Sequence, residues 1–132
     1  MQRRKFVDIV ERKTEEKKYF VTKIMLELGM PVHLRGYHYL REAICLSAEN
    51  MELVGSVTKL LYPEIAKRYH TSNEKVERSM RSVIEVGWER GNKEMYEEIF
   101  GYSAADGKKR PTNSEFVLGI TDYFLRNNQN EL

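Results

Sequence analysis

The segment "TSNEKVERSMRSVIEVGWERG", residues 71–91, holds the side chains best suited to reading nucleic acid. If residues 73–90 or so form a helix at 100° per residue, Glu77, Arg78 and Arg81 lie opposite its apolar face. An α-helix fits the DNA major groove, where arginine can donate two parallel hydrogen bonds to guanine and glutamate can accept one from cytosine. The spacing therefore predicts that these three residues contact bases if the helix enters a major groove. The apolar face consists of Val76, Met80, Val83, Ile84 and Gly87.

The stretch before this helix bears on whether a groove-binding motif is present. "PEIAKRYH", residues 63–70, predicts a short helix, and a break of a few residues follows it. The small Ala66 stands where the second helix of a helix-turn-helix crosses the first closely, but His70 occupies a turn position where glycine is common. From spacing alone, a helix-turn-helix and an ordinary helical hairpin both remain open. The small core shared by the two helices is predicted to contain Ile65, Tyr69 and Val76.

Two groups of residues are suited to contacts with DNA phosphates, which hold a protein in register but read no sequence. One group surrounds the helix start, and the other is the basic run of the loop "GKKRP", residues 107–111. For each lysine or arginine, a solvated side chain without a ligand is the alternative interpretation. The predicted backbone contacts are Lys67, Arg68, His70, Thr71, Ser72, Lys75, Ser82, Lys108, Lys109 and Arg110.

Residues that could support catalysis or metal binding are scattered along the chain. His33 and His38 are five residues apart, which places them on different sides of a helix, and no Cys-x-x-Cys, His-Glu-x-x-His or glycine-rich phosphate loop occurs. The single cysteine, Cys45, lies in an apolar run and is interpreted as a small buried hydrophobe. We therefore expect no enzymatic activity, no cofactor and no bound metal.

The composition is typical of a soluble globular domain. The chain has 132 residues, of which 41% are hydrophobic and 32% charged, enough for one domain with its own core. Its net charge is only +2, so a nucleic-acid surface must arise from local clustering. No secretory signal and no apolar run of about 18 residues occurs, so we expect a cytoplasmic protein without a membrane span.

The hydrophobic period is helical throughout and predicts an all-α fold, a compact domain of six to seven helices. Residues 1–20 are predicted to form a charged N-terminal helix or linker, and residues 21–132 the main domain. That first helix is expected to continue to Gly29, and Pro63 to break or kink the segment before it. Further helices are predicted over residues 33–50, 52–62, 63–70, 93–100 and 114–127.

Helix starts and apolar stripes refine this picture. Capping boxes are predicted from Thr71 to Glu74 and from Thr112 to Glu115. The segment 52–62 is expected to stack Leu53, Val57, Leu60 and Leu61 on one side, and the last helix to pack Phe116, Leu118 or Ile120, and Tyr123 or Phe124.

Several longer motifs occur together in a combination typical of one family. They are "YLREAI", "SVTKLLYPEIAKRY", "KVERSMRSVIEVGWERGN", "IFGYS" and "KRPTNSEF". From about Val21 to Arg126 the chain resembles the C-terminal DNA-binding effector domain of the stage-zero sporulation response regulator, the master transcription factor of spore-forming Firmicutes.

This resemblance implies a six-helix domain with a central helix-turn-helix, and it makes residues 21–132 the helix-turn-helix DNA-binding effector domain. It implies binding to a short element containing TGTCGAA, with two domains in tandem on the DNA. It also implies activation or repression of transcription through RNA polymerase and its sigma factor. Glu77, Arg78 and Arg81 match the base-reading positions of the family.

The sequence departs from the family at positions that bear on DNA recognition. Where the family usually reads "RVERAIRHAIEVAWSRG", Lys75 replaces an arginine and Ser82 replaces a histidine, so a shifted site preference is expected. Residues 1–20 are too few for the phosphoacceptor receiver domain that precedes this domain in the family. The sequence leaves open an effector fragment and a short stand-alone relative. A second hypothesis is a helical protein-interaction module that modulates a related regulator without binding DNA.

Overall fold

The computed structural model describes the backbone of residues 2–128 and the side chains of residues 5, 8, 9 and 11–127. Within that part of the chain all regular elements are helical, which confirms the predicted all-α fold. The α-helices are α1 (Gln2–Glu27), α2 (Arg35–Glu49), α3 (Tyr62–Arg68), α4 (Asn73–Arg90), α5 (Lys93–Phe100) and α6 (Asn113–Asn128). Short helical segments of other pitch are η1 (Met51–Ser56), η2 (Val57–Leu61) and η3 (Ala104–Asp106).

Helix α1 ends close to the predicted stop, and other helices hold its end. Gly29 follows with φ of +75°, a left-handed conformation that glycine adopts without a Cβ clash. The Asn92 N–H donates to the Glu27 carbonyl at 2.9 Å, and the Tyr96 hydroxyl donates to the Leu28 carbonyl at 2.7 Å. These bonds satisfy acceptors that the end of a helix leaves free.

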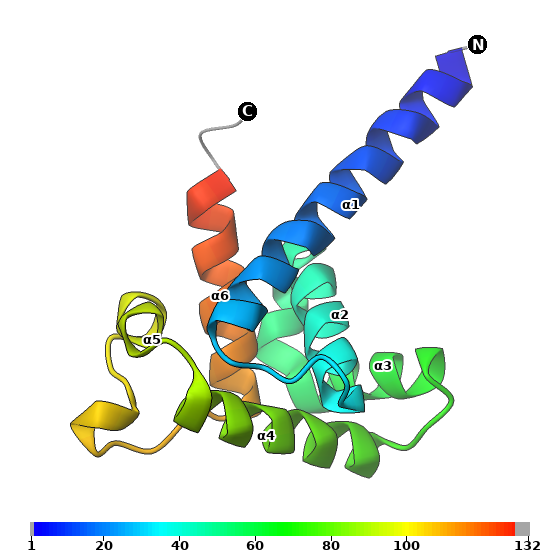
Figure 1. The fold of residues 1–132 in the computed structure, drawn as a ribbon. Helices are drawn as coiled ribbons and strands as arrows, with labels where there is room; N and C mark the ends of the chain where they lie inside the picture. The colour runs from blue at the N-terminus through cyan, green and yellow to red at the C-terminus, as the bar shows by residue number, and fades with distance from the viewer. Residues whose placement is uncertain (1, 129–132) are drawn as a thin grey trace.

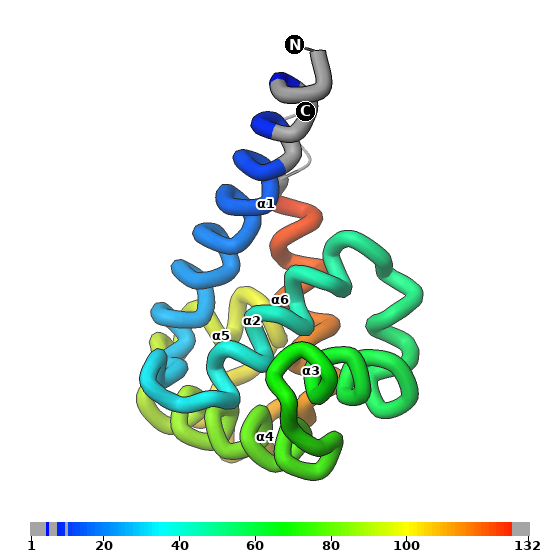
Figure 2. The backbone as a smooth tube through the Cα atoms, turned by 90° about the vertical axis from the view of Figure 1, so that its right-hand side faces the viewer, coloured from blue at the N-terminus to red at the C-terminus, as the bar shows by residue number. Residues whose placement is uncertain are grey.

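The first helix has two different environments along its length. Its N-terminal half projects away from the body of the molecule, whereas its C-terminal part packs on the other helices (Figure 1, Figure 2). The helix runs without a break across residues 20 and 21, and Phe20 packs edge-on against Phe124 with ring centroids 5.2 Å apart. Its buried residues are Val21, Ile24, Met25 and Leu28.

The core forms where α2 meets α4 and α6. Gly36 at the start of α2 allows α4 to approach closely, since a Cβ on Gly36 would lie 2.1 Å from the Ser79 carbonyl oxygen. Helix α4 lies along the edge of the molecule opposite the projecting end of α1 (Figure 1, Figure 2). The largest fully buried side chains of these three helices include Tyr37, Leu40, Ile44, Met80, Ile84, Phe116 and Ile120.

The segment between α2 and α3 differs from the helix expected over residues 52–62. It forms the 3-10 turns of η1 and the wider π-type turns of η2. Leu60 is 49% exposed, so the prediction that it stacks in the core is wrong, whereas Val57 and Leu61 are buried. The 100° rule does not apply to turns of other pitch, which explains the error. No gap separates η2 from α3, and Pro63 lies in the first turn of α3, where its missing N–H costs nothing.

The last helix buries a ridge of residues four apart. Phe116, Ile120 and Phe124 are buried and Tyr123 is half-buried, as predicted. Leu118, the alternative to Ile120, is 47% exposed because it lies about 200° around the helix from Phe116.

Candidate nucleic-acid interface

Helix α3, a tight turn and α4 form the arrangement expected of a helix-turn-helix. The Thr71 N–H donates to the Ala66 carbonyl at 2.9 Å, which closes the C-terminal end of α3. His70 adopts φ of +52°, the left-handed conformation that glycine usually supplies at this position. Histidine is among the residues that enter this region more often than most. The departure from the usual glycine therefore leaves the turn intact.

The start of α4 corrects one prediction. Its cap is Ser72, whose Oγ accepts from the Lys75 N–H at 3.2 Å, and not Thr71. Ser72 has the extended backbone of a capping residue, with φ of −101° and ψ of 159°. Thr71 still belongs to the turn that ends α3, because its N–H bonds back to Ala66. The second predicted box is confirmed by reciprocal 3.1 Å bonds between Thr112 and Glu115.

The core between α3 and α4 is smaller than predicted. Ile65 and Val76 are fully buried, and Ala66 is 6% exposed at the crossing. Tyr69 is 41% exposed, so its assignment to this core is wrong. Its ring instead packs edge-on against that of Tyr39, with centroids 5.0 Å apart, because α3 has ended one residue earlier.

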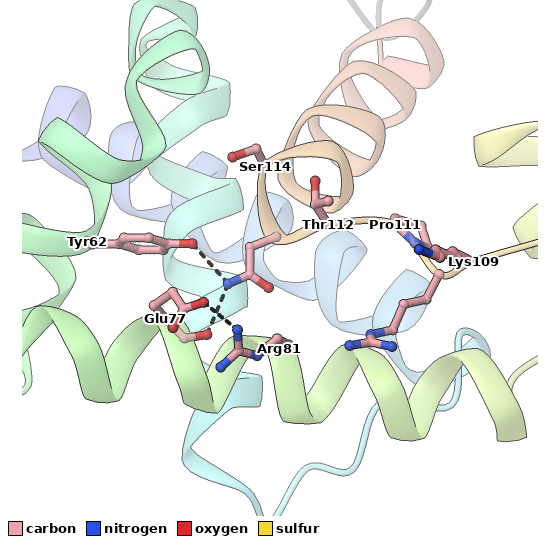
Figure 3. Close-up of a pocket in the computed structure, with 9 residues that line it drawn as sticks. Tyr62, Glu77, Arg81, Lys109, Pro111, Thr112 and Ser114 are labelled. Carbon is pink, nitrogen blue, oxygen red and sulfur yellow. Dashed lines mark hydrogen bonds and ion pairs between the residues drawn. The ribbon is translucent and has the colours of Figure 1, made fainter.

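The outer face of α4 presents the predicted base-contacting residues. The residues predicted to be apolar are all buried, and Arg78 and Arg81 are exposed on the other side. Glu77 is half-exposed at the flank, and its Oε1 lies 3.0 Å from Nη1 of Arg81 (Figure 3). Within residues 2–128 the Arg78 guanidinium makes no ion pair or hydrogen bond. Arg78 is thus the freer of the two arginines.

Some of the residues predicted to contact phosphates are exposed around the turn, and others are already bonded to groups of the protein. Lys67, His70, Ser72 and Lys75 are exposed around the turn, and Thr71 is half-exposed. Arg68 is occupied by carboxylates: its Nε lies 3.0 Å from Glu64, and Nη1 contacts Glu42. The Ser82 hydroxyl donates to the Arg78 carbonyl at 3.1 Å, one turn back in the helix. The hydroxyl proton of Ser82 is therefore already donated within α4, although the side chain is exposed.

The basic loop borders a cleft beside α4. The Arg110 Nη2 lies 2.7 Å from Glu85 Oε1, and the Lys108 amine lies 5.4 Å from the centre of the Tyr102 ring. A cleft of about 530 Å³ separates this loop from α4 and from the start of α6 (Figure 3). It is lined by Tyr62, Glu77, Arg81, Lys109, Arg110, Pro111, Thr112, Asn113 and Ser114. The fold thus brings the loop arginine and a predicted base reader to the walls of one cleft.

Asn113 and Tyr62 belong to this site but were not predicted from the sequence. The Asn113 amide nitrogen donates to the Tyr62 hydroxyl at 2.9 Å and to the Glu77 carbonyl at 3.0 Å (Figure 3). Burial raises the pKa of Tyr62, so its hydroxyl keeps its proton. The only signal in the sequence is a polar residue at the first turn of a helix, which a capping role explains equally well.

The described residues give little support for a metal site, a membrane span or a reactive cysteine. Within residues 2–128 no group of three or more His, Cys, Asp or Glu side chains could hold a metal ion. In the same part of the chain no helix is long and apolar enough to cross a bilayer. Cys45 is half-buried, and burial raises the pKa of its thiol to about 11. The thiol is therefore a poor nucleophile near neutral pH.

A comparison with protein families agrees with the all-α, helix-turn-helix fold. The family model described as the sporulation initiation factor Spo0A C terminal matches residues 21–124. This family is a DNA-binding regulatory domain and not an enzymatic one. The chain belongs to the family of Spo0A C-terminal domains, the DNA-binding domains of a sporulation transcription factor.

Proposed function

We propose that this chain binds double-stranded DNA in a sequence-specific manner, with α4 in the major groove. The observation that carries this proposal is the outer face of α4, where exposed Arg78 and Arg81 follow a short helix and a tight turn. Arginine in this position reads guanine through O6 and N7, and Glu77 accepts from the cytosine amino group. The target is an element like TGTCGAA, which the family resemblance suggests.

The ion pair between Glu77 and Arg81 is compatible with base reading. Both side chains are partly exposed, at 38% and 48%, and a pair at such a site contributes no more than about 1 kcal/mol. DNA can therefore replace it at small cost. While intact, the pair holds the donor of Arg81 next to the acceptor of Glu77, an arrangement that suits adjacent guanine and cytosine bases.

Phosphate contacts on both sides of α4 would fix its position in the groove. On one side lie Lys67, His70, Thr71, Ser72 and Lys75, and on the other the loop with Lys108, Lys109 and Arg110. Arg68, Arg110 and Ser82 contribute less, because carboxylates pair with both arginines and the Ser82 hydroxyl donates to a helix carbonyl. Such contacts hold the register without reading sequence.

The wider assembly is part of the same proposal. Residues 21–132 act as the DNA-binding effector domain, and residues 1–20 as a charged N-terminal helix or linker. Two domains bind in tandem on the DNA, in the cytoplasm, and RNA polymerase with its sigma factor is the protein partner. The domain needs no cofactor and catalyses no reaction.

Replacement of Arg78 by alanine tests the reading face. We expect Arg78→Ala to weaken binding to a TGTCGAA duplex by about 1–3 kcal/mol and to relax specificity at one base pair. Arg126→Ala is the matched control, because Arg126 is an exposed arginine on α6 paired with Asp122 at 2.9 Å. Gel-shift titration of both variants measures the difference. Unchanged affinity after Arg78→Ala refutes the assignment.

Replacement of Lys75 by alanine tests the backbone contacts. Lys75→Ala should weaken binding to every duplex about equally and reduce the salt slope of log K by about one. Anisotropy titrations at several salt concentrations measure this slope. A loss confined to the TGTCGAA duplex would instead make Lys75 a base reader.

The competing function is a protein-interaction module, favoured by the charged N-terminal helix. Of the described side chains between residues 5 and 20, all except Lys17 and Phe20 are exposed. The two functions separate in a low-salt anisotropy assay with any duplex. Absence of DNA binding, together with a stable complex with a related full-length regulator, favours the interaction module.

A further inference from the structure

A single side chain connects three helices beside the predicted base-reading turn. Asn113 is the first residue of α6 and is only 8% exposed. Its amide nitrogen lies 2.9 Å from the hydroxyl of Tyr62, the first residue of α3, and 3.0 Å from the main-chain carbonyl of Glu77 in α4 (Figure 3). The three helices of this part of the fold therefore meet at one amide group.

The chemistry of this contact requires a side-chain amide. An asparagine nitrogen carries two N–H donors, and each has its own acceptor here. The Glu77 carbonyl is part of the α4 backbone, so the Asn113 N–H donates to the second lone pair of the Glu77 carbonyl oxygen. A serine supplies one donor only, and an aspartate presents oxygen acceptors toward a carbonyl oxygen. Most substitutions therefore leave one acceptor unpaired or repelled.

The position of the contact relates it to DNA recognition. Glu77, Arg81 and Glu85 are spaced four residues apart and form one ridge of α4. Asn113 holds the first residue of that ridge and Arg110 pairs with the last at 2.7 Å. Arg110 thereby attaches the basic loop to α4 at Glu85, and Asn113, the residue that starts α6 after this loop, attaches its C-terminal end beside Glu77.

We propose that Asn113 is a positioning residue for DNA binding, which fixes the basic loop relative to the base-reading turn of α4. This inference rests on the proposed function. With the contact intact, the loop cations reach phosphates in the same register in which Glu77 and Arg81 reach bases. Without it, α4 still packs on the core through its apolar face, so cations and reader both remain. Specific binding must then order the loop at the moment of association, which costs affinity.

The test compares two duplexes, one with TGTCGAA and one with the same bases scrambled, by fluorescence anisotropy with the full chain. The readout is the discrimination ratio, the Kd for the scrambled duplex divided by the Kd for the element. Asn113→Ala should lower this ratio about tenfold, while the Kd for the scrambled duplex changes less than about twofold. Tyr62→Phe removes one acceptor and should lower the ratio about threefold. Asn127→Ala is the control and should leave it unchanged, since Asn127 donates to the Tyr123 carbonyl within α6.

The outcomes separate a positioning role from a structural one. An equal loss of affinity for both duplexes overturns the inference, because Asn113 would then only maintain the folded population. A ratio within about twofold of the wild type in Asn113→Ala, with an unchanged melting curve, overturns it as well. If Asn113→Ala does not fold, Tyr62→Phe decides by the same criterion. A wild-type chain that does not distinguish the duplexes refutes the proposed function itself.

Discussion

Substitution of Gly36 by alanine should destabilise the fold at the contact between α2 and α4. A Cβ at this position would lie 2.1 Å from the Ser79 carbonyl oxygen, 2.6 Å from its carbonyl carbon and 2.7 Å from Cγ2 of Val83. Ordinary contact begins at 3.4 Å, so the backbone of α4 must move by about 1.3 Å. Overpacking costs about 1–3 kcal/mol, and a rigid helical carbonyl as the obstacle places Gly36→Ala near the upper end.

The expected loss is large compared with the stability of a small domain. About 3 kcal/mol is a fifth to more than half of the usual 5–15 kcal/mol, and corresponds to a drop in Tm of about 12 °C at this chain length. Thermal melting followed by circular dichroism measures the change. Gly55→Ala is the matched control, because a Cβ on Gly55 meets nothing within 4 Å, and we expect no loss of stability. If Gly36→Ala melts within about 2 °C of the wild type, the close approach of α2 and α4 is refuted.

Three further substitutions or reactions test other parts of the fold. His70→Gly should stabilise the domain by about 0.5–1 kcal/mol in urea titration, because φ of +52° strains a side-chain-bearing residue; a clear loss contradicts this reasoning. Tyr96→Phe should cost about 1–2 kcal/mol in the same assay, because it leaves the Leu28 carbonyl without its 2.7 Å donor; a neutral result means that water replaces the hydroxyl. The pKa of Cys45, about 11 instead of the usual 9.0, makes the thiolate about a hundredfold rarer at pH 8, so alkylation by iodoacetamide should be slow in the folded chain. Alkylation should accelerate as the pH rises to about 11. The free energy of unfolding should fall between about pH 9 and pH 11, because the Cys45 thiol of the unfolded chain loses its proton at a lower pH than that of the folded chain. Fast alkylation at pH 8 would contradict the burial of Cys45.

Helix α4 was predictable from sequence because its signals are local. The buried positions of α4 follow from 3.6-residue periodicity, which acts within a single helix. Gly91 at its end and Gly29 after α1 lie where stop signals were expected. Such local signals locate the end of a helix only to within about one residue, since the cap of α4 is Ser72 and not the predicted Thr71.

The contacts that complete the candidate site were not predictable, because they join residues far apart in the chain. Asn113 lies 36 residues from Glu77 and 51 from Tyr62, and no periodicity connects such positions. The partner of Arg110, Glu85, has the same character at a separation of 25 residues. The prediction that Leu60 is buried was wrong for another reason. The wider turns of η2 have a period different from that of an α-helix, and the sequence of this segment does not indicate them.

The C-terminal part of α1 is fixed to the other helices by its buried residues, whereas its N-terminal half projects from them (Figure 1). Glu27 and Leu28, at the end of the fixed part, are bonded to Asn92 and Tyr96 just after α4. Residues 2–20 span about 28 Å at 1.5 Å per residue, so a tilt of the fixed part by about 10° displaces the start of α1 by on the order of 5 Å relative to residue 20. Small rotations of the fixed part are thus largest at the opposite end of the molecule, where a spectroscopic probe near Lys5 can register them.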